Sequence, residues 1–141
     1  MVFCRKTIKC NESKILFLGS ADLRADFLRK SVQRYFRSQG CETFFPKGGI
    51  HVGNGMIDGE VYDRGFKMAV ELKSDNDDIL RGLGQLLEAL AHGYDEALLV
   101  TSSVRAERLD IKVFEASGIG LASVNSKGEL RLIVEPKIVK F

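Results

Sequence analysis

The feature that most constrains the fold is the alternation of apolar and polar residues along Phe66–Lys73 (FKMAVELK). Successive side chains of a β-strand point to opposite faces of its sheet. One face of this strand is apolar and carries Met68, Val70 and Leu72. The other face carries Lys67, Ala69, Glu71 and Lys73. We therefore expect the first face to lie in the core and the second to present its charged groups together.

The preceding segment, Gly55–Tyr62, predicts the partner strand, because Asp63-Arg64-Gly65 supplies turn residues between the two. A two-residue loop at Arg64-Gly65 pairs Asp63 with Phe66, and the register then follows for the other positions. It sets Val61 against Met68, Ile57 against Leu72, and Asp58 against Glu71. A slip of one residue would turn Asp58 to the other face. The sequence thus predicts a hairpin on which two carboxylates oppose each other.

Directly opposed residues have Cβ atoms about 4.5–5.5 Å apart, so the Asp58 and Glu71 carboxylates would repel and raise one pKa. A hard divalent cation relieves that repulsion, and Mg²⁺ prefers one or two carboxylates with carbonyl and water oxygens. The Leu72 carbonyl lies between the two side chains. Lys73, roughly 6.5–7 Å from Glu71 along the same face, would orient an attacking water or stabilise charge on a phosphate. The alternative is a surface hairpin with an ordinary cross-strand ion pair.

The rest of the chain predicts an α/β protein with a mixed sheet flanked by helices, in the order α-β-β-β-α-β-α-β-β. The first helix begins at Ser20 and ends at Gly40, with Leu23, Phe27, Leu28, Val32, Tyr35 and Phe36 at helical spacing. The second opens at Asp75–Asp78 and ends at Gly93, and the third spans Val104–Ser117. The remaining strands are predicted at Cys41–Phe45, Glu96–Thr101, Ile119–Val124 and Leu130–Val134. Residues 1–13 are expected to be irregular or an edge strand, and Lys14–Gly19 a short strand or lead-in.

Composition bounds the class of protein. The length of 141 residues suits one domain, so we expect residues 1–141 to form a single domain. No apolar run is long enough to span a bilayer, and the N-terminal segment lacks the apolar stretch of a secretory signal. The three cysteines are too few for a disulfide framework and suggest free thiols, which favours a cytoplasmic location.

The net charge of +2 says little about partners, but its distribution says more. The segment 24–37 is strongly basic, with Arg24, Arg29, Lys30, Arg34 and Arg37 against Asp26 alone. It is a candidate face for a polyanion such as DNA, or simply a solvated helix face. Lys47, beside Gly48-Gly49, and Ser74, directly after the Glu71 strand, are further candidates for contacts with phosphates.

Ile57-Asp58, then Glu71-Leu72-Lys73, then a helix with Gln85 and the strand Ala97–Val100, resembles the PD-(D/E)xK nuclease superfamily. The superfamily includes restriction endonucleases, Holliday-junction resolvases and RecB-type exonuclease domains. The resemblance covers about residues 20–101. Ile57 replaces the proline of the family name, and Ala89 stands where RecB-like members often have tyrosine.

The resemblance implies a restriction-endonuclease-like core and metal-dependent hydrolysis of DNA phosphodiester bonds, with branched or junction DNA among the substrates. Asp58 and Glu71, with the Leu72 carbonyl, would bind Mg²⁺ or Mn²⁺. Lys73 and Gln85 would complete the catalytic set. Asp26, and after it Asp22, is the candidate for an additional acid from the first helix. A homodimer is expected by likeness to resolvases, and the rival function is a catalytically silent DNA-binding or assembly module.

Overall fold

The computed structural model describes residues 21–139, with side chains from residue 24 onward. The expectations for residues 1–13, Lys14–Gly19 and Ser20 fall outside the described residues, and those for the side chains of Asp22 and Leu23 fall outside the side chains described. The helices are α1 (Ala21–Ser38), α2 (Ile79–Ala91), α3 (Ser103–Ala106) and α4 (Ile111–Ser117). The strands are β1 (Glu42–Phe44), β2 (Ile50–Val52), β3 (Gly55–Ile57), β4 (Gly59–Asp63), β5 (Phe66–Lys73), β6 (Glu96–Ser102), β7 (Gly120–Val124) and β8 (Leu130–Val134).

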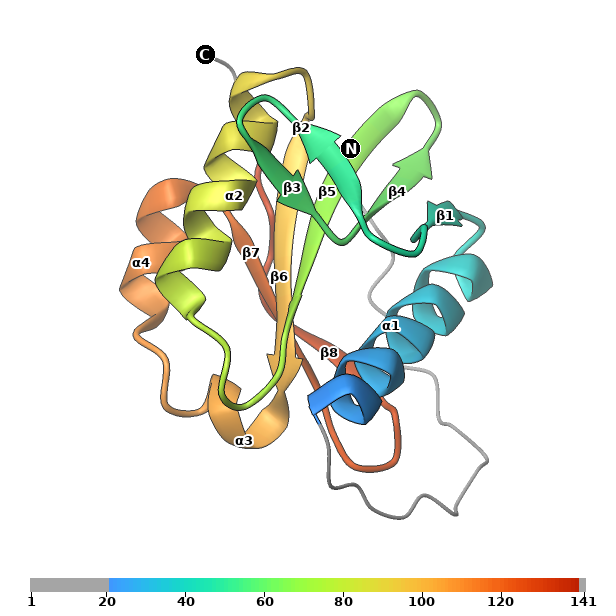
Figure 1. Ribbon diagram of the computed structural model, residues 1–141, viewed down its shortest axis with the longest axis vertical. Coiled ribbons are helices and arrows are strands. Elements are labelled where there is room, and N and C mark those ends of the chain that lie inside the picture. The colour runs from blue at the N-terminus through green and yellow to red at the C-terminus, as the bar shows by residue number, and fades with distance from the viewer. Residues whose placement is uncertain (1–20, 140–141) are drawn as a thin grey trace.

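Six of these strands form one sheet in the order β1-β4-β5-β6-β7-β8, and β2 pairs with β3 in a separate small sheet. The central strands β5, β6 and β7 are parallel, whereas β1, β4 and β8 are attached antiparallel. Helices cover both faces (Figure 1). The predicted α/β class with a mixed sheet flanked by helices is therefore confirmed.

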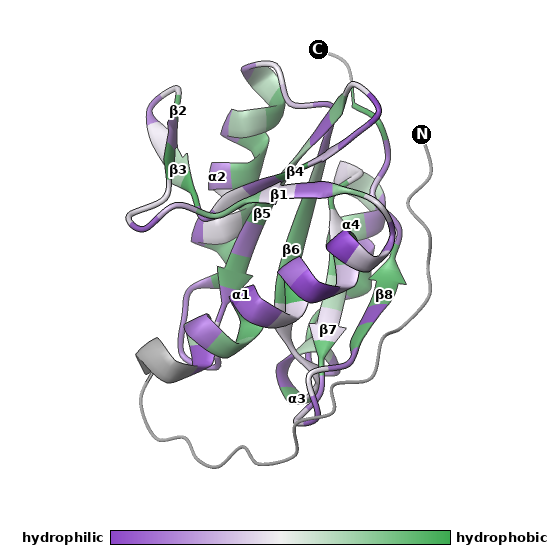
Figure 2. Cartoon of the chain, turned by 90° about the vertical axis from the view of Figure 1, so that its right-hand side faces the viewer, coloured by the Kyte–Doolittle hydropathy of each residue, from purple (hydrophilic) through white to green (hydrophobic). Residues whose placement is uncertain are grey.

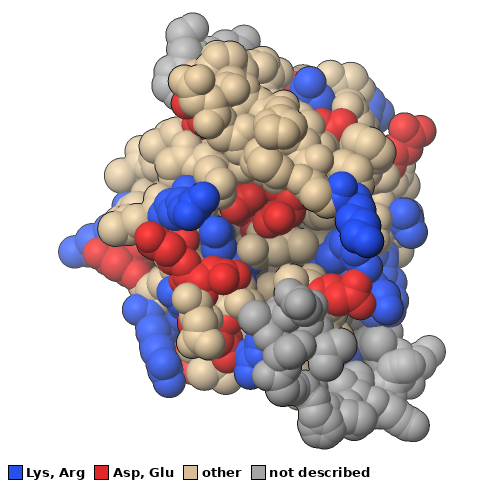
Figure 3. Space-filling model, viewed as in Figure 1, with Lys and Arg blue, Asp and Glu red and all other residues tan. Residues whose placement is uncertain are grey.

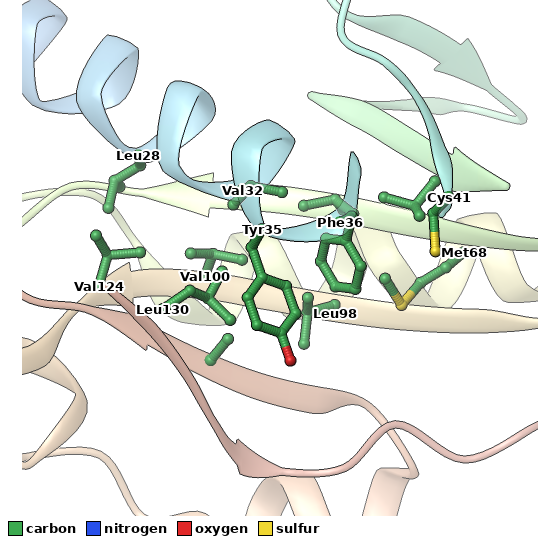
Figure 4. Packing of buried hydrophobic residues seen from close by; sticks show 13 residues of the cluster. Leu28, Val32, Tyr35, Phe36, Cys41, Met68, Leu98, Val100, Val124 and Leu130 are labelled. Carbon is green, nitrogen blue, oxygen red and sulfur yellow. The ribbon is translucent and has the colours of Figure 1, made fainter. Parts of the chain in front are cut away.

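α1 covers one face of the sheet because its apolar residues recur at helical spacing. Its buried side chains Leu28, Val32, Tyr35 and Phe36 pack on Leu98 and Val100 of β6, among others (Figure 4). The predicted members of this stripe that the structure describes all contribute, since Phe27 packs against the same cluster. Figure 2 shows the hydrophilic outer side of α1 turned away from the sheet.

α2 and α4 cover the opposite face. The α2 side chains Leu83, Leu86 and Leu90 are buried there together with Phe114 of α4. The Asp78 carboxylate caps α2 by accepting hydrogen bonds from the N–H groups of Leu80 and Arg81. Asp78 is the last residue of Asp75–Asp78, the segment predicted to open this helix.

Two features of the secondary structure differ from the prediction. The single helix expected at Val104–Ser117 is divided into α3 and α4, because the Asp110 side chain caps a new helix by accepting from the Lys112 N–H. The β2–β3 hairpin was not predicted, and its strands are only three residues long. Gly49 and Gly53 adopt positive φ at the approach to this hairpin and at its tip, a conformation that few other residues adopt easily.

Candidate active site

The β4–β5 hairpin has the predicted register over its whole ladder. Asp63 pairs with Phe66, Val61 with Met68, and Gly59 with Val70. Arg64 and Gly65 form the two-residue loop, both with positive φ, which matches the twist of the adjoining strands.

The ladder ends at Gly59, one residue before the predicted Asp58–Glu71 pair. The expected strand Gly55–Tyr62 is broken at Asp58 into β3 and β4. Ile57 pairs with Ile50 of β2 and packs on the α2 side of the sheet, so its predicted pairing with Leu72 was wrong. The break accompanies a tight contact, because a Cβ on Gly59 would lie 2.1 Å from the Phe45 ring.

Asp58 is held against β5 at this break by hydrogen bonds of its own. Its N–H donates to the Val70 carbonyl at 3.1 Å and to Glu71 Oε1 at 3.0 Å. Its Oδ2 accepts from the Leu72 N–H at 2.7 Å. The two carboxyl groups therefore converge as the register predicted, although a bend rather than a continuous ladder brings them together.

Glu71 and Lys73 are buried side by side on the α2 face of β5. Their side chains belong to residues only 4% and 9% exposed, and Glu71 Oε2 lies 3.5 Å from Lys73 Nζ. Burial, followed by the nearby Asp58 carboxylate, raises the pKa of Glu71 to about 8, while Lys73 opposes the rise. A buried acid of this kind holds a proton near neutral pH unless a second cation is present.

The donor set fits a hard divalent cation held by few protein ligands. The N–H and C=O of one residue face the same edge of a strand, so the Leu72 carbonyl is directed to the edge where its N–H meets Asp58. Within residues 21–139, no group of three or more His, Cys, Asp or Glu side chains is arranged to hold a metal. The residues present thus offer two carboxylates and a carbonyl, which is the number that Mg²⁺ accepts when water and substrate oxygens complete its shell.

Lys73 is confined by α2. A Cβ on Gly82 would lie 2.6 Å from Lys73 Cε and 3.3 Å from a methyl group of Leu99. The absence of a side chain at Gly82 therefore creates the space through which the lysine reaches Glu71. The Thr101 hydroxyl also donates to the Lys73 carbonyl at 2.7 Å, which ties the strand end to β6.

Gln85 lies one turn after Gly82 on α2 and is half-buried beside the β2–β3 hairpin. Its Cγ is 3.8 Å from the position of a Cβ on Gly55, three residues before Asp58. No hydrogen bond from its side chain to Asp58, Glu71 or Lys73 occurs in the described part of the chain. The structure thus brings Gln85 near the site but not into direct contact with the acids.

Asp26 is engaged on α1 itself. Its carboxylate pairs with Arg29, and with Lys30 at 3.2 Å. No third acidic ligand joins Asp58 and Glu71 among residues 21–139, so Asp26 does not complete a carboxylate triad there.

The other basic candidates are more accessible. Arg34, Arg37 and Lys47 are exposed, and Lys30, Gln33, Arg34 and Arg37 line one surface hollow on α1. Figure 3 shows acidic side chains near the middle of one face, flanked on both sides by Lys and Arg.

Ser74 does not fit its predicted role as a phosphate contact. It is buried, and both its N–H and its hydroxyl donate to Asp77. Arg105 Nη1 donates to the Ser74 carbonyl at 2.8 Å and also to the Asp75 carbonyl at 2.6 Å. Arg105 therefore supports the loop after Lys73, a role that no local sequence pattern signals because the contact spans about thirty residues.

Glu60 of β4 is a buried acid that lies outside the candidate site. Its carboxylate is buried and accepts hydrogen bonds from the hydroxyls of Tyr62 and Tyr94. The hydrogen bond to Glu60, followed by burial, raises the pKa of Tyr62 to about 12. Glu60 is thus committed to its tyrosine partners.

Comparisons with known proteins extend the description of the fold. No protein-family model and no curated protein matches the chain. A solved structure, the SPO1766 protein of unknown function from Silicibacter pomeroyi, is similar with a TM-score of 0.62 and 15% identity. The match covers 84% of this chain and 75% of that one. Pyrococcus furiosus SfsA, solved in complex with Ca²⁺, is similar with a TM-score of 0.42 and 17% identity, over 82% of this chain and 62% of that one. The first likeness shows a shared α/β fold. In the described part of the chain, no helix has the length and apolar character needed to cross a membrane.

Proposed function

We propose that this protein is a Mg²⁺- or Mn²⁺-dependent nuclease of the PD-(D/E)xK superfamily, with a restriction-endonuclease-like core, that hydrolyses DNA in a reducing cytoplasm. The observation that supports it most is the convergence of Asp58 and Glu71 at a bend, with the buried Lys73 ammonium 3.5 Å from Glu71. A buried acid with a raised pKa, as Glu71 is, is costly to maintain. Such arrangements occur preferentially at functional sites.

The residues have distinct roles in this proposal. Asp58, Glu71 and the Leu72 carbonyl would hold the cation, which when bound supplies an acidic water and neutralises charge on the phosphate. Lys73 would hold the attacking water or stabilise the charge that develops on the phosphate. Gln85 would orient a phosphate or water beside the β2–β3 hairpin. Arg105 is a positioning residue that acts through the loop after Lys73.

The proposed DNA contacts are the exposed basic side chains of α1, namely Lys30, Arg34 and Arg37, together with Lys47 in the loop after β1. Arg29 would contribute less to DNA binding, because it pairs with Asp26. Arg24 pairs with Asp75, so the beginning of α1 is fastened to the loop that follows Lys73. Only the beginning of α1 is thereby placed beside the loop that follows Lys73, because the helix itself covers the opposite face of the sheet from Glu71 and Lys73.

A catalytically silent DNA-binding module is the second candidate. It is favoured by one observation, namely that no third His, Cys, Asp or Glu joins Asp58 and Glu71 in the described residues.

The test is cleavage of linear, supercoiled, single-stranded and four-way-junction DNA with Mg²⁺ or Mn²⁺. Glu71→Ala and Lys73→Ala should each abolish cleavage, whereas the exposed α4 residues Glu115 and Lys112 provide matched controls as Glu115→Ala and Lys112→Ala. DNA binding without cleavage of any substrate would support the silent module. Equal cleavage by the Glu71 and Lys73 variants would refute the proposed site.

A further inference from the structure

The outer side of α2 carries an apolar stripe that the core does not use. Leu80, Gly84, Leu87 and Ala91 are all exposed and follow one another at intervals of four, three and four residues. This is the spacing of the seam in a coiled coil. Leu80 is 74% exposed and Leu87 is 42% exposed. A surface helix normally places polar residues on this side, so the stripe indicates a contact with another surface.

The helix α4 also carries exposed apolar side chains. Ile111 and Val113 of α4 are both exposed, and α4 lies on the same flank of the molecule as α2 (Figure 1). A 13-residue helix is only about 20 Å long, and stable interfaces usually bury about 1,200–2,000 Å². A contact built on α2 therefore requires such additional apolar surface.

We propose that the stripe is the interface of a two-fold symmetric dimer, in which α2 packs antiparallel against α2 of a second copy. With the axis between Gln85 and Leu86, each large residue of the stripe opposes a small one. Leu80 then faces Ala91 of the other copy, and Leu87 faces Gly84. A two-fold interface must be complementary to itself, and alternating large and small residues achieve this.

The charges beside the stripe are complementary in the same arrangement. Arg81 and Glu88 lie seven residues apart on one flank of it. Antiparallel helices bring equivalent flanks together, so Arg81 of each copy approaches Glu88 of the other. Glu88 already accepts from the Asn54 N–H, which holds its carboxylate in place on α2. A parallel arrangement would instead bring opposite flanks together, so Arg81 and Glu88 would not meet.

This dimer does not depend on the proposed nuclease activity. Gly82, which contacts Lys73, is buried on the opposite side of α2 from the stripe. The candidate active sites of both copies would therefore stay open to DNA.

The experiment is sedimentation equilibrium of the full chain from about 1 to about 100 μM, a range that detects dimers of micromolar affinity. The wild type should reach twice the monomer mass. Leu87→Glu should be monomeric throughout, whereas Val104→Glu should dimerise normally. Val104 is a matched control, since it is apolar and 60% exposed on α3 but outside the stripe.

Gly84→Leu tests the same surface without threatening the fold, because a Cβ at Gly84 meets no atom within 4 Å. It should prevent dimerisation by placing leucine against leucine, and Gly84→Leu combined with Leu87→Ala should restore it. A monomeric wild type would overturn the proposal. So would equal assembly of the Leu87→Glu and Val104→Glu variants, or an unaffected Gly84→Leu dimer.

Discussion

Replacement of Gly82 by alanine should disable the candidate active site while leaving the fold intact. The new methyl group would lie 2.6 Å from Lys73 Cε, where ordinary contacts between carbon atoms are about 3.5–4.0 Å. The lysine must therefore move by about 1 Å or more. Its Nζ is 3.5 Å from Glu71 Oε2, so a shift of that size breaks the contact. A misplacement of about 1 Å in an active site can cost on the order of 10²-fold in rate.

Gly84→Ala is the matched control on the same helix. Both changes favour helix formation by up to about 1 kcal/mol, but the methyl group at Gly84 meets no neighbour. Alanine is also the residue that already occupies the equivalent place in the α2 stripe at Ala91. Gly84→Ala should therefore be slightly more stable than wild type and fully active.

The assay is kcat/KM for DNA cleavage, with thermal unfolding measured alongside. Gly82→Ala should lose about 10²-fold in kcat/KM, and it should cost almost nothing further in a Lys73→Ala background, because the two act through the same side chain. Wild-type cleavage by Gly82→Ala would refute the reasoning about Lys73. An equal loss in Gly84→Ala would show that helix rigidity, and not the contact, is responsible.

Three further predictions concern protons, packing and charge. Because burial and then Asp58 raise the pKa of Glu71 from 4.5 to about 8, its contribution to the stability of the metal-free protein is complete below pH 4.5 and is lost as the pH rises through 8. Glu71→Gln should reduce that loss in pH-dependent thermal unfolding, and Mn²⁺ binding to the wild type at neutral pH should release a proton in calorimetry. Gly59→Ala should destabilise the protein by about 1–3 kcal/mol in urea unfolding, since its methyl group would overlap the Phe45 ring, whereas Gly55→Ala, with ordinary contacts from 3.8 Å, should be nearly neutral. Arg34→Ala should lower the slope of log K against log salt by about 1 in DNA-binding titrations, and an unchanged slope would remove Arg34 from the interface.

Periodicity in the sequence predicted the parts of the fold that one strong pattern determines. The strand Phe66–Lys73 has the predicted bounds because burial of one face and charge on the other permit a single alignment. The apolar stripe of α1 likewise identified the side chains that pack on β6. The hairpin register followed from the turn at Arg64-Gly65, which allows only one short loop.

The errors arose where contacts distant in the sequence override local pattern. Nothing in the alternation from Gly55 to Tyr62 signals that Ile57 leaves the main sheet to pair with Ile50. That choice depends on the small hairpin, whose strands are too short to produce a periodic signal. The approach of Asp58 to Glu71 was predicted for a partly wrong reason, since hydrogen bonds across the bend replace the expected pair of the ladder.

The break at Asp58 also has a consequence for local opening. The β2–β3 hairpin lies outside the six-stranded sheet and packs on α2 through Val52, Ile57 and the Asn54 N–H bonded to Glu88, whereas β5 lies inside that sheet. A two-stranded hairpin outside the main sheet can exchange its amide hydrogens through local openings that cost less free energy than global unfolding. The hairpin should therefore open while β5 stays paired, and each opening would draw Asp58 away from Glu71. A bound cation would oppose that separation, so hydrogen exchange in the hairpin should slow when metal binds.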